Sequence, residues 1–148
     1  MKSKILFSLF VLILGGNSAV YAADIQGVWK NIDDKTGSAK ALIQISQTAS
    51  GVYSGKIVKI TPRPDYTPKE TCVNCPAPFT NKPILGLEII QNLQDVGNNS
   101  FDYGKVLDPL TGKIYTVKAR LSPNGKILFL RGYLGISALG RSQTWIRD

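Results

Sequence analysis

The amino-acid sequence predicts an all-β protein, an antiparallel up-and-down barrel of about eight strands. Three observations predict it. The chain breaks into short β-type runs separated by turn residues, several runs alternate apolar and polar residues, and no long helical stripe appears. About eight strands joined by short links can close into a barrel that is filled or holds one small ligand. A sandwich of two sheets is the alternative, because periodicity alone does not separate the two.

The clearest strands are residues 39–45 and 113–121, where side chains alternate. Ala41, Ile43 and Ile45 point one way while Lys40 and Gln44 point the other. Turn residues separate the runs at 33–37, 97–100, 108–112 and 122–125. The remaining strands are expected at residues 25–32, 52–60, 84–93, 101–107, 126–134 and 141–147, with a loop or short helical turn at 135–140. Residues 61–83 hold six of the eight prolines and are expected to form a long loop.

The first 22 residues have the features of a secretory signal peptide. Lys2 and Lys4 precede an apolar run at residues 5–14, and Val20-Tyr21-Ala22 offers small residues at the spacing of a cleavage site. The run is too short to cross a bilayer, which needs roughly 20 residues. We therefore expect a signal peptide at 1–22, one domain at 23–148, no transmembrane segment, and a periplasmic or secreted protein.

Composition narrows the classes of function. The net charge is +8, and it falls to +6 without residues 1–22, which carry two lysines and no acid. The basic residues are scattered, so we expect no nucleic-acid partner, while an anionic component of the cell envelope is a possible partner. The chain has no histidine, which removes the commonest general base and metal ligand. We expect no enzyme activity, no cofactor and no metal.

The only two cysteines, Cys72 and Cys75, form a C-x-x-C pair in the proline-rich loop. A structural disulfide is favoured, because oxidising compartments promote disulfides. A redox pair normally lies at a helix N-terminus in a βαβ context, and two cysteines fill only half of a zinc site. Both of these alternatives remain open.

The two ends of the domain carry related motifs. Gly27-Val28-Trp29 lies on the first predicted strand and Trp145-Ile146-Arg147 on the last. In a closed barrel these strands are neighbours, so Trp29 could plug one end with Arg147 laid across its ring, a contact worth about 0.5–2 kcal/mol. The pattern resembles the lipocalin superfamily signature, a G-x-W on the first strand and an arginine on the last.

A closer resemblance covers nearly the whole domain. The order "GVWKNIDDKTG", "GKIVKI", "CVNC", "KPILGLEII", "YGKVLDPLTGKIY" and "LRGYLGISALGRSQTWIRD" is similar to the domain of unknown function 2147 family of small exported bacterial proteins. The resemblance implies a lipocalin-like barrel and a periplasmic or secreted location, and it implies no established activity. Residues 101–104 depart from the family, which has paired glycines there.

Candidate binding residues follow from the strand pattern. Arg131 lies mid-strand among apolar residues. If that face is interior, a buried charge needs a partner or a ligand anion, and if it is exterior, Arg131 is a surface residue. Both faces of the run are apolar, so the choice stays open. The remaining candidates for a ligand site are Tyr103, Tyr115, Tyr133 and Arg141.

The size of the barrel interior decides between two functions. Bulky candidates for the interior are Trp29, Tyr115, Phe129 and Trp145, whereas small residues that leave room are Ala39, Ala41, Gly55, Gly104 and Ala119. We expect an exported lipocalin-like protein that binds a small amphipathic or lipid-like molecule. The alternative is a cell-envelope interaction module with a filled barrel and no small-molecule ligand. A thiol-redox enzyme using the C-x-x-C pair ranks third.

Overall fold

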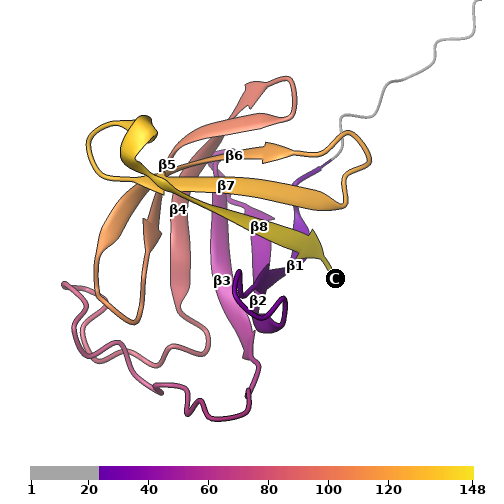
Figure 1. The fold of residues 1–148 in the computed structure, drawn as a ribbon. Coiled ribbons are helices and arrows are strands. Elements are labelled where there is room, and N and C mark those ends of the chain that lie inside the picture. The colour runs from indigo at the N-terminus through magenta and orange to yellow at the C-terminus, as the bar shows by residue number, and fades with distance from the viewer. Residues whose placement is uncertain (1–23) are drawn as a thin grey trace, which may run out of the picture.

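The computed structural model describes residues 24–148, which form eight antiparallel strands closed into one barrel (Figure 1). Each strand pairs with the next in sequence, and the first pairs with the last. The elements are β1 Gly27–Ile32, β2 Ala39–Gln47, β3 Tyr53–Ile60, β4 Glu88–Gly97, β5 Ser100–Leu107, β6 Ile114–Leu121, β7 Ile127–Tyr133, the 3-10 turn η1 Ser137–Leu139, and β8 Arg141–Arg147. The barrel predicted from the sequence is confirmed, and the sandwich alternative is wrong.

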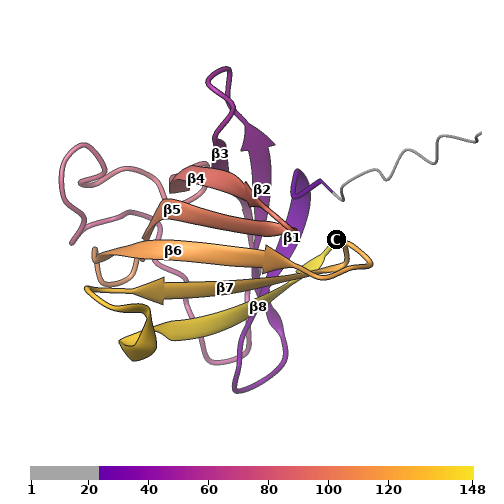
Figure 2. The ribbon, with the colours of Figure 1, turned by 90° about the horizontal axis from the view of Figure 1, so that it is seen from above.

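From above, the strands β5 to β8 lie side by side along one wall of the barrel (Figure 2). No helix among residues 24–148 has the length and apolar character needed to cross a membrane. The signal peptide predicted for residues 1–22 lies outside the described residues.

One half of the barrel interior is filled by side chains. The inward-facing residues that are at most 5 % exposed are Trp29, Ile43, Ile45, Ile57, Ile90, Leu93, Phe101, Val117, Leu121, Leu128, Leu130 and Trp145. The small residues Gly55 and Gly104 leave no space, because neighbouring side chains occupy it. A Cβ on Gly55 would lie 3.1 Å from the Ile90 Cβ, and one on Gly104 would lie 2.8 Å from the Val117 Cγ1. The room expected at Gly55 and Gly104 is therefore absent.

At the seam where β1 meets β8, Arg147 lies across the Trp29 ring, as the paired end motifs predict. The Arg147 guanidinium lies 4.3 Å from the centre of the Trp29 ring, and Trp29 donates its indole N–H to the Ile25 carbonyl at 2.9 Å. Arg147 also donates to the carbonyls of Asp24, Gln26 and Gly125. Position 27 needs glycine for two reasons: its φ is +132°, and a Cβ would lie 2.7 Å from the guanidinium.

Residues 101–104 form a bulge in β5. The register with β6 shifts between Phe101 and Gly104. Tyr103 takes up the extra residue with φ +62°, a conformation that glycine adopts easily and tyrosine does not. The Asp102 side chain accepts the Tyr103 N–H at 2.7 Å, which gives this carboxylate a structural role.

The β3–β4 loop folds back onto the outer wall of the barrel. Cys72 and Cys75 form a disulfide, as predicted, and both residues are buried. Their sulfur atoms lie 3.8 and 3.9 Å from the Pro109 carbonyl oxygen, a packing contact because a disulfide has no S–H to donate. At Gly112 a Cβ would lie 1.8 Å from the Asn74 carbonyl oxygen, so the disulfide segment rests directly on the β5–β6 turn.

Candidate functional site

At the other end of the barrel the inward-facing side chains are less buried, and we call this end the mouth. Its inward-facing residues are Asn31, Ala41, Ile60, Val106, Tyr115, Gly132, Arg141 and Gln143, which continue the alternation of the buried residues along their strands. All are half-buried except Arg141, which is exposed. Because the same faces are fully buried at the Trp29 end, the change in burial marks where the packed core stops.

Two gaps in the strand pairing lie at the mouth. Pairing of β1 with β8 ends at Asn31 and Trp145, although β8 begins four residues earlier, at Arg141 (Figure 1). Pairing of β3 with β4 ends at Lys56 and Glu88, although β3 continues to Ile60. The wall therefore closes fully around the core and only partly around the mouth.

The floor of the mouth carries polar groups. Asn31 pairs with Trp145 across the seam, and its side-chain Oδ1 is buried with no hydrogen-bond partner. Gln143, two residues before Trp145, accepts the Trp145 indole N–H at 3.1 Å. An unpaired buried acceptor costs free energy, on the order of 1–3 kcal/mol.

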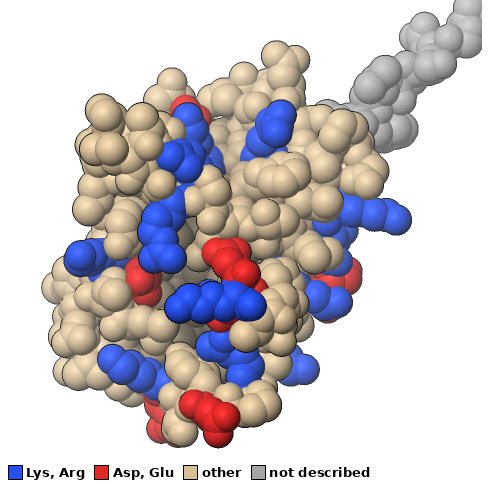
Figure 3. Space-filling view, viewed as in Figure 1, with Lys and Arg blue, Asp and Glu red and all other residues tan. Residues whose placement is uncertain are grey.

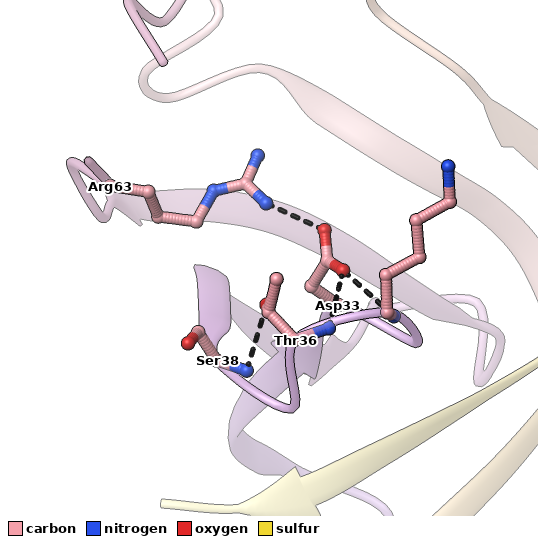
Figure 4. A network of polar contacts seen from close by, with 5 residues as sticks. Asp33, Thr36, Ser38 and Arg63 are labelled. Carbon is pink, nitrogen blue, oxygen red and sulfur yellow. Dashed lines mark hydrogen bonds and ion pairs between the residues drawn. The ribbon is translucent and has the colours of Figure 1, made fainter. Parts of the chain in front are cut away.

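A network of polar contacts joins the β1–β2 turn to the start of the β3–β4 loop at the edge of the mouth (Figure 4). Arg63, at the start of the β3–β4 loop, forms an ion pair of 2.6 Å with Asp33 in the β1–β2 turn and lies 4.4 Å from the Tyr66 ring centre. Asp33 also accepts the backbone N–H groups of Lys35 and Thr36. These bonds, with the Lys35 N–H first and Arg63 contributing, hold the pKa of Asp33 below its ordinary value of 3.8.

Arg131 lies on the outer wall, so the exterior alternative is the one observed. Its Nε donates to the Ser137 carbonyl at 2.6 Å, and its two terminal nitrogens donate to the Ala138 carbonyl and the Ser142 hydroxyl. The guanidinium thus forms its hydrogen bonds with the β7–β8 connection and the start of β8, and it does not reach the barrel interior. Phe129, expected as a possible inward residue, is also on the outer wall and is 41 % exposed.

The other predicted ligand residues divide between the mouth and the outer surface. Tyr115 and Arg141 face the mouth. Tyr133 shares the outer face with Arg131, and Tyr103 is 64 % exposed at the bulge.

Sequence reasoning missed Asn31 and Gln143, although alternation gave a usable signal. Each lies two residues from a buried tryptophan on the same strand, Asn31 from Trp29 and Gln143 from Trp145. Counting by two from these tryptophans places both polar side chains inside the barrel.

Two hollows lie outside the barrel, beside the β3–β4 loop. Ile89 and Leu107 point outward from β4 and β5, and the loop buries them around a hollow of about 10 Å³ that Phe79 also lines. Beside it runs an open groove of about 280 Å³, lined by Lys56, Phe79, Lys82, Pro83, Leu85, Gly86, Leu87 and Glu88. The groove is open to solvent and carries both signs of charge, so it is the weaker candidate.

Residues 24–148 hold no group of three or more Cys, Asp or Glu side chains that could bind a metal ion. Several carboxylates have structural roles: Asp33 and Asp108 accept turn N–H groups, and Asp102 accepts one at the bulge.

Comparisons with known proteins identify relatives of the chain. A family model described as "Uncharacterized protein conserved in bacteria (DUF2147)" matches residues 27–147. A solved structure titled "Protein HP1028 from the human pathogen Helicobacter pylori belongs to the lipocalin family" is similar, with a TM-score of 0.71 and 19 % sequence identity over 86 % of this chain and 84 % of that one. No curated protein matches the chain. At this identity the solved structure shows a shared fold.

Proposed function

Because the chain belongs to the DUF2147 family and has a lipocalin-like barrel, we propose that it binds a small amphipathic molecule in the mouth. The observation that carries the proposal is the change in burial along the barrel: inward-facing side chains are packed at the Trp29 end and half-buried at the mouth, where Asn31 and Gln143 add polar groups to an apolar wall. Ligand sites in proteins are concave and mostly apolar, with a few placed polar groups.

The geometry of the mouth restricts the ligand. The inward-facing side chains above the packed core form about two layers, roughly 7 Å of strand rise. A compact molecule fits this depth, whereas a long acyl chain would need the space that Ile90 and Leu93 fill. Tyr115, Val106 and Ala41 offer apolar contact, Asn31 accepts a hydrogen bond, and Arg141 at the rim attracts an anionic or polar end.

The proposed role is binding rather than catalysis. A catalytic site needs an acid, base or nucleophile with a tuned environment. The inward-facing polar residues of the mouth are an amide pair, a tyrosine and an arginine, which suit recognition of a ligand better than proton transfer.

We also propose that the protein is exported to the periplasm or secreted. The predicted signal peptide and the buried disulfide support this location, since disulfides persist in oxidising compartments. Cell fractionation, with the mass of the processed chain measured by mass spectrometry, tests it. A chain that kept residues 1–22 and stayed in the cytoplasm would contradict the proposal.

Binding is tested with anilinonaphthalene sulfonate, a compact aromatic anion, after native mass spectrometry on protein purified without detergent. We expect saturable binding of one probe, with energy transfer from Trp145 below the mouth. The Gly132→Val variant should block binding. A Cβ added at Gly132 would lie 3.6 Å from the Tyr115 Cβ, and the two methyl groups of valine would extend into the mouth.

Matched arginine variants locate the site. Arg141→Gln should weaken probe binding several-fold, while Arg120→Gln should leave it unchanged, because Arg120 lies on the outer wall near Phe129. Probe binding that is equal in Gly132→Val and the parent protein would refute the proposal that the mouth is the site.

A further inference from the structure

The β7–β8 connection displays three large aliphatic side chains to solvent. Leu134, Ile136 and Leu139 are 58 %, 62 % and 80 % exposed, and we call them the apolar tip. A single exposed aliphatic residue is normal on a protein surface, but three within six residues form a patch that needs an explanation. Neither the packed core nor the proposed mouth site accounts for the apolar tip.

The apolar tip is held in a defined shape. Arg131 reaches from the outer wall of β7 and donates to the Ser137 carbonyl, the Ala138 carbonyl and the Ser142 hydroxyl. At Gly140 the chain packs so closely that a Cβ would lie 2.6 Å from the Gly132 carbonyl oxygen. Because the turn is already ordered, binding a partner would cost little free energy for ordering it.

The wall of the barrel that carries the apolar tip has one sign of charge. Residues 109–147, which include β6, β7 and β8, contain no Asp or Glu. Of their basic residues, Lys118, Arg131 and Arg141 lie at the end of the strands nearest the apolar tip, whereas Arg120, Lys126 and Arg147 lie toward the other end. In the space-filling view the region of the β7–β8 connection is an uncharged lobe with Lys and Arg beside it, and most acidic atoms lie in the lower half of the face (Figure 3).

We propose that this side of the barrel docks on an anionic lipid leaflet, with the apolar tip inserted among the headgroups. Moving aliphatic side chains out of water lowers the free energy, and the Lys and Arg residues of the adjoining wall are attracted to anionic lipid. A second copy of the chain is a poor occupant, because the same basic surface on both copies would repel. This proposal is independent of the ligand proposed for the mouth.

The experiment is vesicle flotation with the domain at low and high salt. We expect binding to vesicles containing phosphatidylglycerol, little binding to pure phosphatidylcholine, and loss of binding as salt screens the charges. Changing Ile136 and Leu139 together to serine should weaken binding by about tenfold or more, since two aliphatic side chains no longer leave water. The matched control changes Val73 and Val96 to serine. These two are 56 % and 49 % exposed on other parts of the surface, and their variant should bind like the parent.

A Leu139→Trp variant gives a second readout that does not depend on loss of binding. Its tryptophan fluorescence should shift to the blue when phosphatidylglycerol vesicles are added, because the new ring enters the headgroup region. Absence of vesicle binding by the parent protein would overturn the proposal. Equal vesicle binding by the two double-serine variants would also overturn it. So would a dimer seen by light scattering that depends on the apolar tip and forms without vesicle binding.

Discussion

Replacing Trp29 with alanine tests the seam that closes the barrel. Trp29 is fully buried, and the change removes its ring, its indole hydrogen bond to the Ile25 carbonyl and the surface on which Arg147 lies. Losing a large buried aromatic costs about 3–5 kcal/mol, and the cation–π contact adds about 0.5–2 kcal/mol. We therefore expect a loss of about 5 kcal/mol in the free energy of unfolding, a large share of the roughly 5–15 kcal/mol typical of domains.

Urea denaturation followed by far-UV circular dichroism measures this loss. With a slope of about 2 kcal/mol per molar urea, a change of about 5 kcal/mol should lower the midpoint by about 2.5 M. Trp29→Phe should lose less, because a ring stays beneath Arg147. Arg147→Ala should also lose less than Trp29→Ala, since no large cavity forms. The matched control is Phe129→Ala on the outer wall, where the ring is 41 % exposed and the loss should be under about 1 kcal/mol. A Trp29→Ala midpoint equal to that of the parent would refute the reasoning that this residue plugs the barrel.

Three further predictions follow from other features. Tyr103→Gly should stabilise the domain by about 0.5–1 kcal/mol, because glycine adopts φ +62° without strain and the tyrosine ring is 64 % exposed; a lower thermal midpoint would contradict this. Reducing the disulfide should raise hydrogen exchange in the β3–β4 loop and leave the β-sheet dichroism intact, since the closed ring contributes only about 2 kcal/mol; loss of the sheet signal would show that the loop holds the barrel. The folded-state pKa of Asp33 is lowered, so its contribution to stability is present above its unfolded pKa and is lost as pH falls through the folded pKa. Asp33→Asn should thus be less stable than the parent at neutral pH, with the difference vanishing in strong acid, and a constant difference across pH would argue against this ionisation.

Alternation predicted the fold well because one face of most strands is buried. Residues 39–45 and 113–121 alternate clearly; the first segment lies within β2, and all of the second except Lys113 lies within β6. The apolar residues Ile84 and Leu87 predict a strand that starts at residue 84, whereas β4 starts at Glu88. These two residues are buried by the loop itself, where the Gly86 N–H donates to the Ile57 carbonyl, so their apolar character reflects loop packing.

The candidate site was harder to predict, for a physical reason. The strand that carries Arg131 is apolar on both faces, since Leu128 and Leu130 point inward while Ile127 and Phe129 point outward. The sequence pattern therefore does not indicate whether the Arg131 side chain points into the barrel or outward. The polar residues of the mouth were missed because a polar side chain in a strand usually faces water, and only the closed barrel shows that some face inward.

The pairing of β1 with β8 also has a consequence for how the chain folds. Every other strand pair joins neighbours in sequence through a connection, whereas this pair joins residues more than a hundred positions apart, such as Trp29 and Arg147. Contacts of that separation form late, because the loop-closure entropy must be overcome first. Before closure, the meander is an open sheet with two unpaired edges. At high concentration β8 of one molecule can pair with β1 of another, so we expect weakening of the Trp29–Arg147 contact to favour strand-exchanged oligomers over simple unfolding.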